Sequence, residues 1–176
     1  MDDFTRLILQ GAFGLFCLLV AAAALFDLWK LIIPNTVSVA LVILFFATVL
    51  VLGFPVDWLS HLGAGAAVLL AGMAAFHFGV LGAGDAKLLA AVSLWAGFEY
   101  LLIYLLVVAL CGGGLVVLLW LLRRIVSGVL LYQNAPEDIV LPPVLLPQGV
   151  VPYGGAIALG AIYLAFKSPL LGGDLF

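Results

Sequence analysis

The sequence has 176 residues, of which 67% are hydrophobic and only 9% are charged, and its mean hydropathy is +1.39. Soluble globular domains carry about 25% charged residues, so this composition excludes that class and indicates a polytopic membrane protein. The net charge of −3 includes six basic residues that form no dense patch, and we therefore expect no nucleic-acid partner. Two isolated cysteines, Cys17 and Cys111, provide no Cys-x-x-Cys zinc spacing.

Six membrane-spanning helices are predicted, because a span needs roughly 20 apolar residues to cross the hydrocarbon. In chain order the apolar runs cover about 7–26, 36–54, 59–80, 86–98, 100–122 and 154–166. Residues 123–149 are too polar and too rich in proline for a span, and we expect a cytoplasmic loop there. No internal repeat is visible, so the sequence predicts one all-α transmembrane domain over residues 1–176.

The basic residues predict the orientation of these spans. Four of them lie in links on one side of the predicted membrane and two lie on the other: Lys30, Lys87, Arg123 and Arg124 against Arg6 and Lys167. Because basic residues favour the cytoplasmic side, the N-terminus is predicted outside. Both Asp27 and Asp85 then lie toward the cytoplasm, and the C-terminus lies outside.

The fourth predicted span is short. It has about 13 residues before Glu99, or roughly 20 Å of helix, whereas the hydrocarbon is about 30 Å thick. Either Asp85 lies roughly 10 Å below the inner interface in a water-filled cavity, or the membrane is locally thinner.

Asp27 and Asp85 are the strongest candidates for chemistry, since ionisable groups near hydrocarbon are costly and usually mark a functional site. For Asp85 the alternative is a helix N-cap entered through Gly82 and Gly84. Asp27 ends a helix, where an anion opposes the helix dipole, so a purely structural role needs a partner such as Lys30.

Two carboxylates brought together on one face can perform amide hydrolysis. Two such groups within hydrogen-bonding distance cannot both ionise easily, so they share one proton. The ionised group takes a proton from water, which attacks the carbonyl carbon, and the protonated group donates to the developing oxyanion. This chemistry requires no metal and no cofactor.

Three segments of the chain resemble a known family. Asp27-x5-Ile33-Pro34-Asn35 and Gly82-x-Gly84-Asp85-x-Lys87-Leu88 resemble the two signature segments of the type IV prepilin peptidases, which are GxGD intramembrane aspartic proteases. The stretch from Val151 through Pro152, Tyr153 and Gly154 is similar to the segment that opens the last span of short family members.

This resemblance implies that Asp27 and Asp85 are the catalytic aspartates. It also implies removal of a short basic leader from prepilin-like precursors at the cytoplasmic side of a bacterial inner (plasma) membrane. Long members carry paired Cys-x-x-Cys motifs associated with N-methylation, and these are absent from the sequence. We therefore expect a multi-pass, peptidase-only protein of the Tad/Flp pilus type, without methyltransferase activity.

The remaining motif residues have two interpretations each. Gly82 and Gly84 either let substrate backbone approach Asp85 or only form the turn. Lys87 either favours ionisation of a nearby carboxylate or extends to the interface. Pro34 and Asn35 either shape the loop beside Asp27 or only separate two helices. A further set either lines a substrate groove or only begins the last span: Pro152, Tyr153 and Gly154.

Two other functions remain alternatives at this stage. A small proton-coupled transporter could use the aspartates as a relay, although repeated halves are not visible. A non-catalytic assembly subunit would use both aspartates structurally. The expected partners are the lipid bilayer and a prepilin-like precursor, and a GxxxG-like surface suggests a homo-oligomer.

Overall fold

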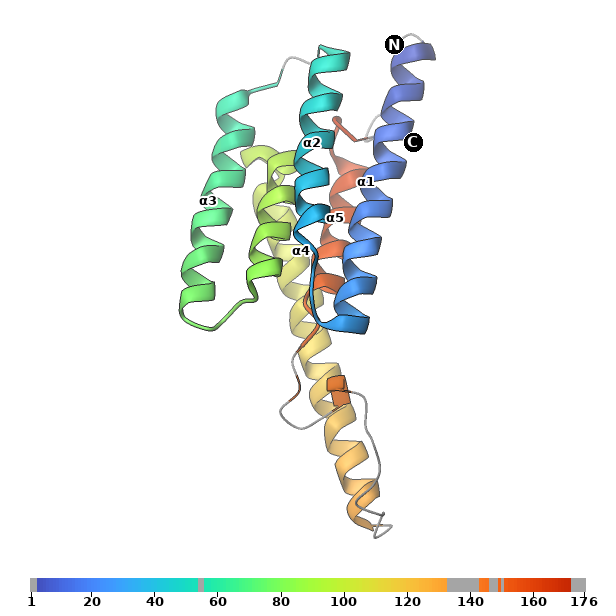
Figure 1. Cartoon of the computed structure of the whole chain (residues 1–176), viewed down its shortest axis with the longest axis vertical. Coiled ribbons are helices and arrows are strands. Elements are labelled where there is room, and N and C mark those ends of the chain that lie inside the picture. Colours follow the sequence, from blue (N-terminus) through green and yellow to red (C-terminus); the bar gives the residue numbers. More distant parts are fainter. Residues whose placement is uncertain (1–2, 54–55, 133–142, 146–148, 150, 172–176) are drawn as a thin grey trace.

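The chain folds into a bundle of helices (Figure 1). The computed structural model describes residues 3–53, 56–132, 143–145, 149 and 151–171. Its α-helices are α1 (Asp3–Lys30), α2 (Asn35–Leu52), α3 (Trp58–His77), α4 (Ala83–Tyr132) and α5 (Gly154–Lys167), and a 3₁₀ helix, η1, covers Pro143–Leu145. These described ranges contain no strand, in agreement with the predicted all-α class.

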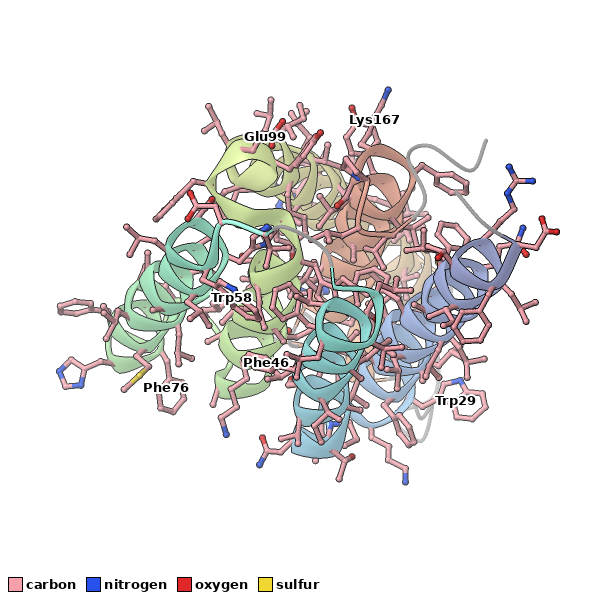
Figure 2. The ribbon with its side chains drawn as sticks, turned by 90° about the horizontal axis from the view of Figure 1, so that it is seen from above. Trp29, Phe46, Trp58, Phe76, Glu99 and Lys167 are labelled. Atoms are coloured by element: carbon pink, nitrogen blue, oxygen red, sulfur yellow. The ribbon has the colours of Figure 1, made fainter. Side chains whose placement is uncertain are left out.

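Within the described residues, four helices are long and apolar enough to cross a membrane, α1 to α4, and α5 is a shorter apolar helix. Large apolar side chains cover the outside of the bundle, as Trp29 and Phe76 illustrate in Figure 2. Trp29 is 82% exposed, which suits a surface in contact with lipid rather than water. The multi-pass membrane class is thereby supported, while the count of six crossings and their orientation stay predictions.

A break at Gly97 divides α4 into two helical segments, 83–96 and 98–132. Gly97 has φ 57° and ψ 179°, a conformation that is essentially confined to glycine. The chain reverses its direction at this point (Figure 1). Two contacts from α3 hold the break: the Phe98 N–H donates to Ser60 Oγ at 2.9 Å, and His61 Nδ1 donates to the Leu94 carbonyl at 2.8 Å. The predicted boundary between the fourth and fifth spans lies within about two residues of this break.

The core is centred on Trp95, which is fully buried. Its indole makes edge contacts with Phe16 of α1 and Phe45 of α2, with ring centroids 5.2 and 5.4 Å apart. Its Nε1–H donates to the Leu41 carbonyl at 3.1 Å, so the polar end of this ring is satisfied inside an apolar core. Helices α1, α2 and α4 are therefore fixed against one another through a single side chain.

The predicted loop over residues 123–149 was wrong at its start. Helix α4 continues to Tyr132, because the sequence from Arg123 onward consists mainly of Arg and apolar residues and has no proline before Pro136. The described part of the following segment folds back on this helix. Arg123 donates from Nε to the Val144 carbonyl at 3.0 Å and from Nη2 to the Gly149 carbonyl at 2.8 Å.

The break in α4 can be tested with two glycine substitutions. Gly97→Ala should destabilise the protein by about 1–3 kcal/mol, because its Cβ would also lie 3.1 Å from Ser60 Oγ and His61 Cε1. Gly113→Ala in the same helix meets nothing within 4 Å and should be neutral or stabilising by up to about 1 kcal/mol. Thermal unfolding in detergent, followed by circular dichroism, measures both. An unchanged midpoint for Gly97→Ala would contradict the break.

Candidate functional site

Four parts of the chain meet at one end of the bundle: the last turn of α1, the link 31–34, the first turn of α4 and the first turn of α5 (Figure 1). A cavity of about 220 Å³ lies here, and both Asp27 and Asp85 line it. Folding therefore brings together the two residues that the sequence singled out, although 58 positions separate them in the chain.

Asp27 is held by the first residue of the last helix. Its side chain is only 6% exposed, and its Oδ2 accepts the backbone N–H of Gly154 at 2.7 Å. An anion in the last turn of α1 opposes the dipole of that helix, but the N-terminus of α5 carries the opposite partial charge and compensates it. Lys30 is placed differently, because its Nζ lies 5.7 Å from the centre of the Phe26 ring.

The contact between Asp27 and Gly154 requires a residue without a side chain. A Cβ atom at Gly154 would lie 2.9 Å from both Cβ and Oδ2 of Asp27, which is closer than carbon atoms normally approach. The glycine is thus required by the close approach of α5 to α1 rather than by its own backbone conformation.

Asp85 is the third residue of α4, and Gly82 takes the N-cap position in its place. The Gly82 carbonyl accepts the Ala86 N–H at 3.0 Å, and the Gly82 N–H interacts with the Asp85 carboxylate, as in a capping box. The other oxygen, Oδ1, is buried and has no hydrogen-bond partner among the described residues. Helix capping therefore accounts for only part of this carboxylate's surroundings.

The wall of the cavity opposite α4 comes from the link between α1 and α2. Leu31 follows the last residue of α1; it has φ 54° and donates its N–H to the Asp27 carbonyl at 2.9 Å. The link then packs on α4, since a Cβ at Gly84 would lie 3.0 Å from Ile33 Cβ. Gly84 thus lets the link approach the start of α4, and Leu31, Ile32 and Ile33 become cavity residues that the chemistry-based argument had not selected.

We call the cavity that Asp27 and Asp85 line the aspartate cavity. Several predicted residues lie beside it rather than in it. Pro34 precedes α2 in an extended conformation and makes no side-chain cap. Asn35 begins α2 and accepts a hydrogen bond from Lys87 Nζ at 2.9 Å. Asn35 and Lys87 line a separate, larger cavity, so Lys87 is paired with an amide instead of a carboxylate.

The residues before α5 position that helix. The Tyr153 ring lies against Gly112 of α4, where an added Cβ would be 2.6 Å from Tyr153 Cε1, and Pro152 is buried. Of the predicted set Pro152, Tyr153 and Gly154, only Gly154 touches Asp27 in the described contacts. Gly112 was missed by the sequence argument, although the run Gly112-Gly113-Gly114 inside an apolar span is a visible signal.

The described residues offer the site no metal-binding cluster. No group of three or more His, Cys, Asp or Glu side chains in them is placed to hold a metal ion. Asp27 and Asp85 are the acidic residues that line the aspartate cavity. Asp27 and Asp85 each have a backbone N–H against the carboxylate, and Asp85 Oδ1 is buried without a partner among the described residues. The pair therefore keeps an acceptor atom that can take up a proton.

Cysteine pairing can test this arrangement without any assay of function. In a background with Cys17 and Cys111 replaced by serine, Asp27→Cys with Asp85→Cys should be linked efficiently by a short bifunctional thiol reagent, detected by changed gel mobility. The matched control pairs Asp27→Cys with Asp57→Cys, because Asp57 caps α3 at the opposite end of the bundle. Equal linkage of the two pairs would contradict the described cavity.

Comparison with known proteins identifies the family. A sequence model of the type IV leader peptidase family matches residues 14–117, which is more than half of the chain and includes both Asp27 and Asp85. No curated protein and no solved structure gave a significant match. From the extent of the family match, this chain belongs to the type IV leader peptidase family.

Proposed function

We propose that this protein is an intramembrane aspartic endopeptidase that removes the short basic leader from pilin-like precursors, with Asp27 and Asp85 as its catalytic pair. Membership of the type IV leader peptidase family supports a leader peptidase in general. The observation that carries the assignment of residues is that both carboxylates line one cavity of about 220 Å³. Aspartates far apart, or separated by packed side chains, would not support it.

The reaction needs only the pair and one water molecule. The ionised carboxylate takes a proton from water as the water oxygen attacks the amide carbon, and the protonated carboxyl group donates to the carbonyl oxygen. Collapse of the tetrahedral intermediate breaks the C–N bond, and a proton passes to the leaving amine. The Gly154 N–H fixes the orientation of Asp27 during these steps, as a preorganised backbone donor should.

The finer assignments rest on sequence features. Orientation toward the cytoplasm is supported by the excess of basic residues on one side of the predicted spans. Lys30 is the last residue of α1, Lys87 lies near the start of α4, and Arg123 and Arg124 lie in its second segment. A precursor of the Tad/Flp type is proposed because the motif pattern resembles that of the short family members. The proposed location is a bacterial plasma membrane, in keeping with the apolar helices of membrane-spanning length and the family match.

Neutralising either aspartate should abolish cleavage. With a pilin-like precursor co-expressed, Asp27→Asn and Asp85→Asn should each reduce leader removal by at least about 100-fold, the usual contribution of a general acid or base. Asp57→Asn is the matched control, because Asp57 accepts the Leu59 and Ser60 N–H groups as an N-cap and asparagine caps equally well. Gel mobility of the precursor, at equal membrane abundance, is the measurement. Full cleavage by either variant would remove that residue from the mechanism.

Displacing Asp27 without changing its charge gives an independent test. Gly154→Ala should lower cleavage by about 100-fold, the effect of a misplacement of about 1 Å, because its Cβ would overlap Asp27. Gly155→Ala, one position further along α5, meets nothing within 4 Å and should leave cleavage near the wild-type rate. Similar losses in both variants would show that the helix, rather than its contact with Asp27, is what matters.

A further inference from the structure

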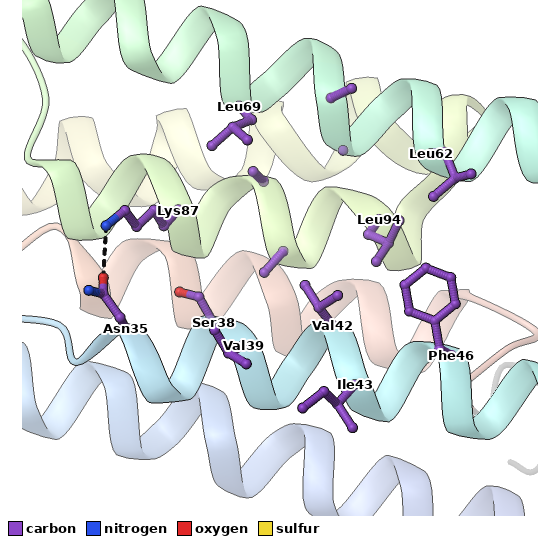
Figure 3. Close-up of a pocket in the computed structure, with 14 residues that line it drawn as sticks. Asn35, Ser38, Val39, Val42, Ile43, Phe46, Leu62, Leu69, Lys87 and Leu94 are labelled. Carbon is purple, nitrogen blue, oxygen red and sulfur yellow. Dashed lines mark hydrogen bonds between the residues drawn. The ribbon is translucent and has the colours of Figure 1, made fainter.

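A second cavity begins beside the aspartate cavity and follows α2, α3 and the first segment of α4 (Figure 3). We call it the α2–α4 groove; it has a volume of about 610 Å³ and extends along α2 from Asn35 to Phe46. Asn35, Ser38 and Lys87 supply polar side chains at one end, and most of its other lining residues are apolar. The groove therefore suits an amphipathic ligand with its polar part at a defined end.

Ser38 is the observation that points to a ligand. Its side chain lines the groove, the residue is 7% exposed, and its Oγ has no hydrogen-bond partner among the described residues. A hydroxyl inside a helix usually bonds the carbonyl four residues earlier, and Thr48 and Ser93 do so here, both at 2.8 Å. A buried hydroxyl without a partner costs about 1–3 kcal/mol, and a polar ligand group at this end of the groove would remove that cost.

The polar end of the groove adjoins the aspartates. Lys87 follows Asp85 by two residues, and Asn35 follows the cavity residue Ile33 by two. From this end the groove follows α2 for eleven residues, or roughly 17 Å, which is about half of the hydrocarbon thickness. A chain leaving the aspartate cavity toward the centre of the membrane would reach the groove by passing the start of α4, where Ile33 packs against Gly84.

The shape of the groove fits a helix lying against the protein. Its floor contains Gly65 and Ala66 of α3 and Ala90 and Ala91 of α4, and small residues allow close approach of another helix. A helix about 10 Å wide and 17 Å long occupies roughly 1,300 Å³. The groove volume of about 610 Å³ corresponds to a helix embedded to about half of its width.

We propose that the α2–α4 groove binds the apolar segment of the precursor that follows the cleaved bond; this inference rests on the proposed function. A peptide bond must be free of helical hydrogen bonds to be attacked, and its neighbouring N–H and C=O groups then need partners where water is scarce. Ser38 Oγ, the Asn35 amide and the remaining donors of Lys87 supply them. Beyond this end, the apolar residues of the precursor pack on the floor.

A variant that fills the groove should impair cleavage of one substrate and not of another. Ala66→Phe places a ring on the groove floor, whereas Ala67→Phe places the same ring at the next position of α3, which is also exposed but does not line the groove. The substrates are a full precursor with a basic leader and an apolar helix, and a soluble peptide that ends a few residues after the cut. Ala66→Phe should lower kcat/KM for the precursor at least about tenfold, equivalent to roughly 1.4 kcal/mol, without changing cleavage of the peptide. Ala67→Phe should change neither.

A second variant avoids any steric disturbance. Ser38→Ala removes a hydroxyl that has no hydrogen-bond partner in the described part of the chain, so the midpoint of thermal unfolding should not fall. The KM for the full precursor should nevertheless rise by a few-fold, since one hydrogen bond contributes about 0.5–1.5 kcal/mol. Ser93→Ala, which removes the bond to the Leu89 carbonyl, serves as the comparison and should leave KM unchanged.

The outcomes distinguish the two proposals. If wild-type protein cleaves neither substrate, the proposed function fails and the groove proposal fails with it. If Ala66→Phe processes the full precursor at the wild-type rate, the groove does not hold the substrate, and a lipid acyl chain becomes its occupant. Loss of both substrates in Ala66→Phe would also overturn the proposal, because the damage would then lie in the peptidase itself.

Discussion

The hydrogen bond between the Gly154 N–H and the Asp27 carboxylate is the interaction on which the site depends. Asp27 stands at the end of α1, where the dipole of its own helix disfavours a negative charge. Helix α5 supplies the opposing dipole and a directed donor, but only because Gly154 has no Cβ to strike Asp27. The ring of Tyr153 against Gly112 in turn fixes the level at which α5 begins. The packing of the last helix therefore determines whether the Asp27 carboxylate has its hydrogen-bond donor.

The second aspartate also lies at the N-terminus of a helix. Asp85 lies in the first turn of α4 and Asp27 faces the first turn of α5, so that two helix N-termini point toward one cavity. Their partial positive charges reduce the cost of placing two carboxylates together where water is scarce. The link between α1 and α2 closes the remaining side, because Gly84 allows Ile33 to pack against the start of α4. Among the described residues, the lining of this cavity contains no Lys or Arg. Backbone N–H groups, and the space left by Gly84 and Gly154, therefore form the surroundings of the pair.

The sequence was sufficient for the features that arise from local patterns. Apolar runs predicted the helices, and the interruption of the apolar run at Glu99 predicted a boundary near Gly97. The alternation of spans predicted a common side for Asp27 and Asp85. The Gly154 contact could not be predicted, since a backbone donor leaves no side-chain signature and its acceptor is 127 residues away. The pairing of Lys87 with Asn35 depends equally on tertiary packing. The catalytic roles of the aspartates and the six membrane crossings stay predictions.

The separation of Asp27 from Gly154 also bears on the biosynthesis of the protein. At about 5–20 residues per second, a ribosome adds the 127 residues between them in roughly 6–25 s. Throughout that interval the nascent chain contains Asp27 without its donor, even after Asp85 has been made. The segment that carries the family match, residues 14–117, likewise lacks the Gly154 donor, because it ends before α5. The arrangement around Asp27 can therefore form only after α5 has been made, and the packing of α5 against α1 is the event that completes it.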